Sequence, residues 1–446
     1  MSRNNNKFSW SLFLSASGSQ LQLLGTSLSI TECFVLASFP FVVFHEWPYM
    51  KRNRVLTLFW LAAATVVGCV IASFVNHTEW WAMLRGMAVT VIMTCSIVVG
   101  HWLLRRNMNG FKWMLLGVAL SGIISTFYFM KSVEVSQMGG LGAKVTAEDI
   151  MSGPIFWISR IRPFAMLIPS GWYLQCPILV SALIPVAFGL FAILSTESGR
   201  SAALSALAAA ALVLVGGKRQ RTIMRVCRNF WKLMLVSVVA VFLAKNLYSL
   251  AASSGWLGEK SRLKYEKQTQ GDTSMMKLLL GGRMESFCGL FACVDKPIVG
   301  FGPWAIDRDG YTSEFLRRYG TYEDYENILR METDGRDRSQ QSLIPCHAYI
   351  TEFWLWYGIS GLLFWLYVLF VFVRFLRQDC WVVPQWYMWL AAGIPGYCWG
   401  IFFSPLGERA ISMMFVVACL MARAVRLGMQ PLPENMIEEI RKSELK

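Results

Sequence analysis

The sequence HAYITEFWLWYGISGLLFWLYVLFVFV, residues 347–373, decides how this chain folds. It follows a charge-rich segment that begins with GGRMESFCGLFACVDKPIVGFGPWA, residues 281–305, and a single histidine, His347, stands at the junction. As one α-helix these 27 residues would reach about 40 Å, which exceeds the hydrocarbon core of a bilayer, about 30 Å. We therefore expect one membrane span with His347 at its water-facing end.

One face of this predicted helix carries two glycines beneath the histidine. On a period of 3.6 residues, the positions within about 40° of His347 are Thr351, Trp354, Gly358 and Gly361. Small residues mark helix contacts inside a bilayer, because they let two backbones approach closely. We predict that Gly358 and Gly361 have a structural role in helix packing.

The composition is that of an integral membrane protein. Of the 446 residues, 55% are hydrophobic and only 16% are charged, whereas soluble domains carry about 25% charged residues. The predicted fold class is all-α, a polytopic integral membrane protein with about 10–12 transmembrane helices and one large periplasmic insert. The net charge of +14 is held in short runs beside apolar segments, which indicates basic cytoplasmic loops and no nucleic-acid partner.

Basic clusters set the expected orientation. Residues 218–232 contain six cations and no acid, so we place them in the cytoplasm. Counting spans in both directions from there puts the turn at 195–200, the segment 251–346 and His347 on the outer face. The apolar runs used in this count are 25–44, 55–75, 86–104, 113–130, 177–195, 201–216, 230–250, 347–373, 383–403 and 410–425.

The same count divides the chain into four regions. They are N-terminal transmembrane helices over 1–250 with an outer-face arginine turn near 200, a large and partly helical periplasmic loop over 251–346, C-terminal transmembrane helices over 347–426, and a cytoplasmic tail over 427–446. Within the loop, 313–342 predicts one or two amphipathic helices. The number of crossings stays open at 1–24, a short span or a signal peptide, and at 131–195, where we expect two.

Cysteine and histidine spacing gives no metal-ligand pattern, so neither a metal nor another cofactor is expected. Three cysteines, Cys288, Cys293 and Cys346, share the polar segment. They either form a disulfide or remain buried free thiols.

Arginines on the expected outer face are exceptions to the rule that basic residues gather on the cytoplasmic side. Arg200 lies between two spans, where its guanidinium either binds a phosphate through a forked contact or pairs with Glu197 at the interface. Arg283 is a candidate of the same kind, and the alternative is a solvated loop arginine. Arg409 is a candidate substrate-binding residue, although an ion pair with Glu408 is the simpler interpretation. Further candidates in the apolar, proline-rich stretch before 180 are Arg160 and Arg162.

His347 is the candidate base. An imidazole titrates near pH ~6.5 and suits removal of a proton from a hydroxyl, although a lone histidine at this position is also explained as a satisfied interfacial residue. Cys346 is not expected to act with it, because adjacent residues in a helix point about 100° apart. Glu352 lies about 140° from the histidine face and is expected to pack or to form a pair. The stretch GFGPW, residues 300–304, has no GK[ST] ending and predicts a tight turn.

The order of these motifs resembles the O-antigen ligase and O-antigen polymerase superfamily, which are bacterial multi-spanning glycosyltransferases. The resemblance covers about residues 155–375. It rests on ESGR before an apolar span, on GGRMESFCGLFACVDKPIVGFGPWAI, and on HAYITEFWLWYGISG at the start of a long span. The histidine followed at eleven and fourteen residues by glycines is the most specific part.

The resemblance implies an enzyme of the bacterial inner membrane whose active site faces the periplasm. It implies inverting, metal-independent transfer of a glycan from undecaprenyl diphosphate to an acceptor hydroxyl, with His347 as the base and with Arg200 and Arg283 on the diphosphate. The implied partners are the lipid-linked glycan donor, a glycan or lipid A core acceptor, membrane lipid and other polysaccharide-assembly proteins.

Three functions remain open at this point. The first is a ligase that moves a completed polysaccharide onto lipid A core, and the second is a polymerase that extends a carrier-linked repeat unit. The third is a transporter of lipid-linked sugars without chemistry, which predicts ionisable residues in mid-span. The spans are nearly free of such residues, and Glu32, the main exception, lies near a span end, which argues against the transporter. The ligase is preferred to the polymerase because the histidine-glycine element of the resemblance is well preserved.

Overall fold

The computed structural model describes residues 29–50, 55–106, 286–319, 343–375 and 387–403, with isolated residues between 246 and 266 and between 413 and 421. This part of the chain is mostly helical, and an isolated antiparallel bridge joins Ile306 to Leu343. Three of its helices are long and apolar enough to cross a membrane. The described ranges are therefore helical as predicted, and their long apolar helices are compatible with the predicted membrane protein.

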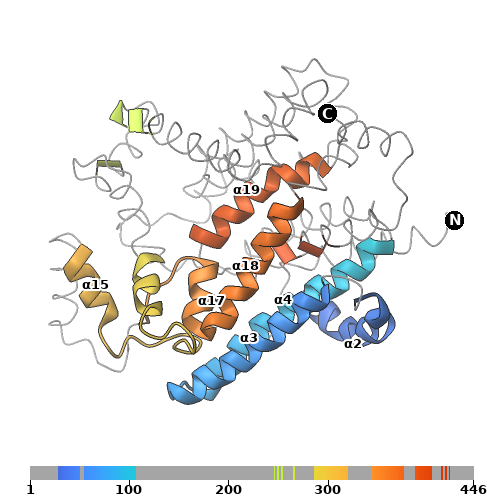
Figure 1. Ribbon diagram of the computed structural model, residues 1–446, viewed down its shortest axis with the longest axis horizontal. Helices are drawn as coiled ribbons and strands as arrows, with labels where there is room; N and C mark the ends of the chain where they lie inside the picture. Colours follow the sequence, from blue (N-terminus) through green and yellow to red (C-terminus); the bar gives the residue numbers. More distant parts are fainter. Residues whose placement is uncertain are drawn as a thin grey trace, which may run out of the picture.

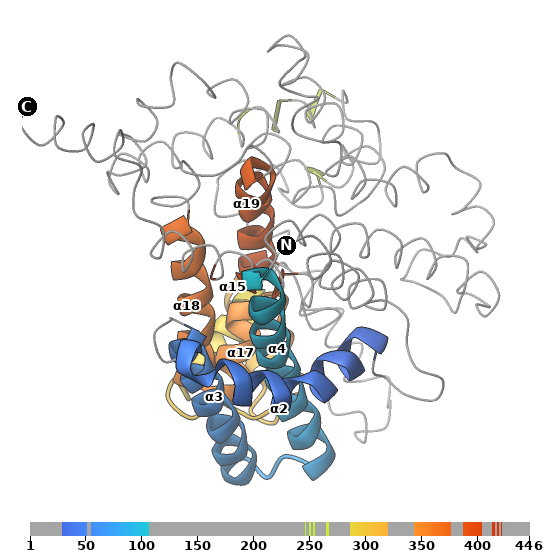
Figure 2. The same cartoon turned by 90° about the vertical axis from the view of Figure 1, so that its right-hand side faces the viewer.

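Helix α2 (Ile30–Met50) starts with a reciprocal cap. The backbone N–H of Ser29 donates to the Glu32 carboxylate over 2.6 Å, and the Glu32 N–H donates to the Ser29 hydroxyl over 3.2 Å. This arrangement satisfies two N–H groups that a helix start leaves open. Glu32 is thus explained as a helix cap. Figure 2 shows α2 lying across the next two helices.

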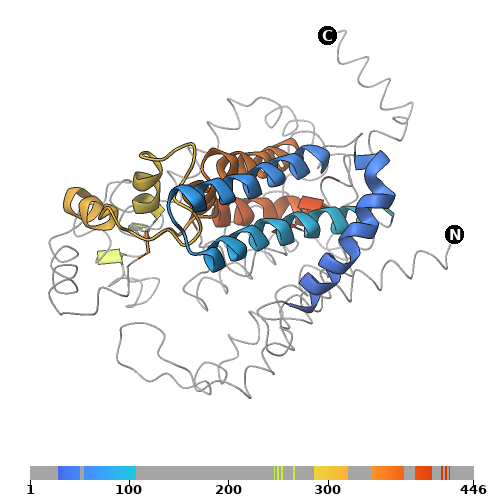
Figure 3. The same cartoon turned by 90° about the horizontal axis from the view of Figure 1, so that it is seen from below.

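Helices α3 (Val55–Val75) and α4 (Trp80–Arg106) form a hairpin, seen side by side in Figure 3. The bounds of α3 agree with the predicted span at 55–75. The turn between them closes with a hydrogen bond of 2.9 Å from the Thr78 N–H to the Ser73 carbonyl. Bulky aromatic side chains near this end of the hairpin are exposed, among them Phe74, Trp80 and Trp81.

The predicted single span at 347–373 is wrong. Two helices occupy it, α17 (Tyr349–Tyr357) and α18 (Ile359–Arg374), and Gly358 between them has a φ of 65°. The chain folds back there. The contact that shows this is the stacking of Phe353 on Phe364, with ring centroids 5.8 Å apart. The two helices lie side by side in Figure 1.

The reversal at Gly358 changes where His347 lies relative to the apolar helices. Tyr349 packs on Trp365, with 5.3 Å between ring centroids, and Trp365 lies near the middle of α18. His347 precedes Tyr349 by two residues and therefore lies beside α18. It is not at the far end of one continuous helix, as the sequence had predicted.

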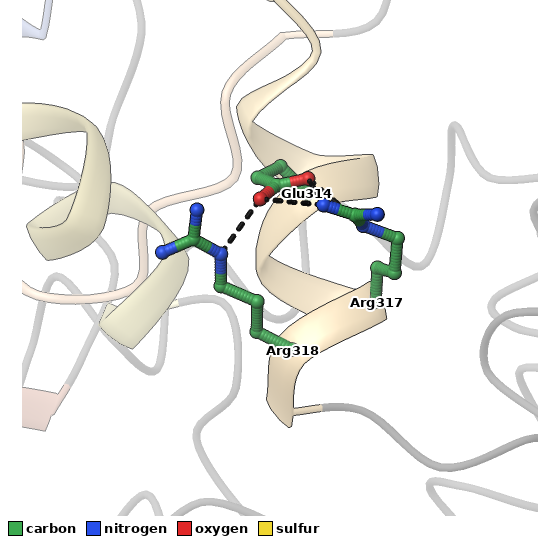
Figure 4. A network of polar contacts seen from close by, with 3 residues as sticks. All are labelled: Glu314, Arg317 and Arg318. Carbon is green, nitrogen blue, oxygen red and sulfur yellow. Dashed lines mark hydrogen bonds and ion pairs between the residues drawn. The ribbon is translucent and has the colours of Figure 1, made fainter.

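Helix α19 (Tyr387–Phe403) packs against α17 and α18 and falls within the predicted span at 383–403. Outside the apolar helices, α15 (Tyr311–Tyr319) buries Tyr311 and Phe315 and exposes its charged face. On that face Glu314 accepts hydrogen bonds from Arg317 and Arg318, as Figure 4 shows. The predicted amphipathic helix is confirmed up to Tyr319, and residues 320–342 lie outside the described part.

Candidate functional site

A short extended segment, residues 343–348, delivers His347 to the start of α17. The Ile344 N–H donates to the Ala305 carbonyl over 2.9 Å, which fixes the segment to the loop before α15. Ala348 is extended, with a φ of −148°, and its carbonyl accepts the first hydrogen bond of α17 from the Glu352 N–H. His347 is half-buried immediately before this helix start. Its place in the chain is therefore set by backbone contacts on both sides.

Cys346 is packed against the helical residues 286–293. A side chain on Gly289 would meet the Cys346 sulfur at 2.8 Å, so only glycine fits at that contact. Burial, and after it the nearby Glu352 carboxylate, raise the pKa of Cys346 well above its usual value. The thiolate is disfavoured there, which agrees with the prediction that Cys346 is not a nucleophile.

The three cysteines of the polar segment are free thiols in this structure. Cys293 donates a weak hydrogen bond to the Thr351 carbonyl, with sulfur and oxygen 3.8 Å apart. Burial raises the pKa of Cys293 to about 12. Cys293 thus lies at the contact between residues 286–293 and α17, and Cys288 lies 3.9 Å from the Thr312 hydroxyl of α15, both as buried cysteines that pack.

The stretch DKPIVGFG, residues 295–302, caps the reversal between α17 and α18. The N–H groups of Phe301 and Gly302 donate to the carbonyls of Leu355 and Trp356, over 2.6 and 3.1 Å. In return, the Ile359 N–H donates to the Ile298 carbonyl over 3.1 Å. These bonds satisfy backbone groups that the end of α17 and the start of α18 would leave open.

The predicted tight turn at GFGPW is confirmed. Gly300 and Gly302 both have positive φ, 78° and 86°, a region that residues with a side chain rarely enter. Trp304, at the end of the turn, has a φ of 51°. The further role of this turn, closing a broken helix, could not be predicted, because the residues it bonds to are more than fifty positions away.

The two predicted packing glycines have different partners. A side chain on Gly361 would collide with the Phe353 backbone, so the glycine is what lets α18 pack closely against α17. A side chain on Gly358 would collide with the Ile298 carbonyl, so Gly358 admits a loop and not a helix. The close contact at Gly358 is therefore with residues 298–299 of the loop. The close approach of α3 depends on Gly68, whose added side chain would meet the Tyr357 carbonyl oxygen at 2.9 Å.

The five predicted outer-face and substrate-binding arginines cannot be placed beside His347. They are Arg160, Arg162, Arg200, Arg283 and Arg409, and all lie outside the described residues.

Other cations gather near the loop that caps α17. The Arg85 guanidinium lies 4.7 Å from the ring centroid of Trp304. The Lys296 ammonium donates to the Asn76 side-chain oxygen over 2.7 Å and lies 4.6 Å from the ring centroid of Phe301. Sequence reasoning missed both cations. The one signal for Arg85 was an arginine at the start of an otherwise apolar helix.

A cavity of about 590 Å³ opens beside these cations, between the α3–α4 turn and the loop 296–309. Its described lining does not include His347.

Comparison with known proteins does not assign this chain to a family. No protein-family model matches the chain, and no curated protein matches it.

Proposed function

We propose that this protein is a membrane glycosyltransferase of the O-antigen ligase type. It transfers a glycan from undecaprenyl diphosphate to an acceptor hydroxyl at the periplasmic face of the bacterial inner membrane. The wider architecture of the proposal is polytopic, with about 10–12 spans and the segment 251–346 outside.

One observation carries the proposal. The two stretches with the most specific resemblance, 295–304 and 347–361, are bonded to each other through the backbone of Phe301, Gly302 and Ile359. Stretches that hold a reaction centre together must be adjacent in space, and the residues bonded here are more than fifty positions apart in the sequence. Their contact holds the C-terminal end of α17, and the bond from the Ile344 N–H to the Ala305 carbonyl holds the segment before His347. A histidine at the start of a helix that is held at both ends supports the proposed catalytic role.

His347 acts as the general base in the proposed mechanism. An imidazole nitrogen accepts the proton of the acceptor hydroxyl while the hydroxyl oxygen attacks the anomeric carbon of the donor sugar. The bond from that carbon to the diphosphate oxygen breaks, and undecaprenyl diphosphate leaves with the electron pair. A single displacement of this kind inverts the anomeric carbon.

Positive charge is needed where the diphosphate leaves. Arg200 and Arg283 supply it in the proposal, because a guanidinium stays charged and binds phosphate oxygens in pairs. The start of α17 adds a partial positive charge next to His347, since the first N–H groups of a helix point out of its N-terminus.

The transporter alternative is weakened by where the buried ionisable groups lie in the described part of the chain. Glu46 and His101 are 2% exposed, but each lies within about a turn and a half of the end of α2 or α4. Proton and substrate pathways place such groups in mid-span. Glu32 caps α2 and is accounted for by that role.

The test is deletion of the gene followed by gel analysis of surface lipopolysaccharide. Accumulation of carrier-linked polymer that is not attached to lipid A core supports the ligase, and lipid A core bearing a single repeat unit supports the polymerase. Unchanged lipopolysaccharide contradicts both. Reintroduced His347→Ala should insert at the wild-type level and fail to restore the pattern. Arg317→Ala, on the exposed face of α15, is the matched control and should restore it.

A further inference from the structure

The α3–α4 turn and the loop 296–309 enclose a cavity to which the proposed reaction assigns no role. Its volume of about 590 Å³ lies in the range of about 300–1,000 Å³ that holds small organic ligands. Figures 1 and 3 agree in placing the turn of the blue hairpin next to the yellow loop that forms the other wall. The cavity therefore lies between two segments that are more than two hundred residues apart in the sequence.

The two walls are locked together by polar contacts. The Asn76 amide donates to the carbonyls of Ala72 and Gly300, over 2.8 and 3.0 Å, and its oxygen accepts from Lys296. Gly302 is so close to Thr78 that a side chain on it would collide with the threonine hydroxyl. The cavity is thus preformed, because both walls are held by the folded chain.

The lining combines both signs of charge with apolar surface. Lys296 and Arg308 contribute cations, and Glu79 and Asp309 contribute carboxylates. His77, Arg308 and Asp309 are exposed to solvent, so they can reach a ligand. Phosphate-rich ligands favour cations alone, because carboxylates repel them. A sugar hydroxyl instead both donates and accepts hydrogen bonds, and a mixed set of donors and acceptors satisfies it.

The apolar part of the lining suits the same ligand class. Val75, Ala305, Ile306 and Leu343 contribute aliphatic residues to the lining, and Trp304 lines the cavity as well. Sugars carry C–H faces between their hydroxyl groups, so a wall of this kind removes apolar surface from water while the polar groups fix the orientation.

The cavity lies next to an expected membrane boundary. Phe74, Trp80 and Trp81 flank the α3–α4 turn and are 72%, 57% and 61% exposed. Exposed aromatic side chains at a helix end are typical of the interface between lipid and water. A ligand in the cavity would therefore be held at the bilayer surface.

We infer that this cavity is a binding site for an uncharged oligosaccharide, either free or as the head group of a glycolipid. The inference depends on the cavity and not on glycan transfer. If transfer is the function, the site holds one of the saccharides involved, and that assignment alone depends on the proposed function.

The test uses the purified full-length protein in detergent and in lipid nanodiscs. Saturation-transfer NMR with maltotriose, cellotriose, mannotriose and triacetylchitotriose tests the free saccharide. Native mass spectrometry of nanodiscs containing digalactosyldiacylglycerol tests the lipid-held head group. Signal with a trisaccharide identifies the free source, and signal with the glycolipid alone identifies the lipid source. Absence of binding in both experiments overturns the inference.

Variants locate the ligand. Arg308→Ala and Asp309→Ala should each weaken binding about tenfold, as expected for loss of a hydrogen bond to a charged group. Arg317→Ala is the control, because its exposed guanidinium is held by Glu314 and does not line the cavity. Binding that is kept at the wild-type level in both cavity variants would place the ligand elsewhere and overturn the inference, as would sucrose octasulfate binding in preference to every neutral sugar.

Discussion

The backbone N–H of Phe301 donates a hydrogen bond to the carbonyl oxygen of Leu355, with 2.6 Å between nitrogen and oxygen. This bond joins the turn at GFGPW to the last turn of α17 and lets an apolar stretch reverse direction without leaving that carbonyl unbonded. Non-helical backbone among membrane-spanning helices is tolerated where protein covers it. The reversal at Gly358 therefore depends on the loop 295–302 as much as on the glycine itself.

Substitution of Gly358 tests the reversal. Gly358→Ala should lower the thermal unfolding midpoint of the purified protein in detergent, for two reasons. The positive φ costs about 1–2 kcal/mol in an alanine, and the new methyl group also overlaps the Ile298 carbonyl. Gly310→Ala is the matched control, because Gly310 has a φ of 74° with open space around it. Equal losses in the two variants would show that the loop does not press on Gly358.

A second prediction concerns the contact of Asn76 with Lys296. Asn76→Ala and Lys296→Met each remove their shared hydrogen bond, so the second substitution should cost less when the first is already present. We expect a coupling free energy of about 1 kcal/mol in a double-mutant cycle of unfolding. Losses that add without coupling, within about 0.5 kcal/mol, would contradict the contact between the turn and the loop.

Gly68 on α3 should be intolerant of a side chain, because it meets the Tyr357 carbonyl at the end of α17 and Ser360 at the start of α18. Gly68→Ala should destabilise the protein by about 1–3 kcal/mol, as expected for overpacking. Ser360→Ala removes one of the two overlaps, so the double variant should recover part of the loss. Recovery measured by thermal unfolding supports the contact, and a double variant that is less stable than Gly68→Ala alone refutes it.

The exposed cluster on α15 predicts a pH dependence. Hydrogen bonds from Arg317 and Arg318 lower the pKa of Glu314. A carboxyl group with a lowered pKa in the folded state stabilises it above the ordinary pKa, and that contribution is lost as the pH falls through the lowered value. Glu314→Gln should therefore be less stable than the wild type at pH 7, and the difference should vanish in acid. Thermal unfolding across this range checks the sign, and a difference that grows in acid would contradict it.

The sequence by itself determined the helical class and several helix positions. Apolar runs of sufficient length have few alternatives to a helix in lipid, and α3 follows its run from Val55 to Val75. The glycines of GFGPW likewise determined a turn, because positive φ at Gly300 and Gly302 is a local property of residues that lack a side chain. Both results depend on interactions between residues close in the chain.

Only the tertiary structure decided that residues 347–373 reverse. In the sequence, Gly358 and Gly361 fit the packing face of one continuous helix, and nothing local distinguishes that from a reversal. Ile298, Phe301 and Gly302 form the hydrogen bonds that satisfy the backbone at the reversal, and they lie more than fifty residues away. The cavity is decided in the same way, since Asn76 and Lys296 meet across 220 positions. Periodicity reports on neighbours along one helix, whereas contacts between distant segments arise only once those helices have packed.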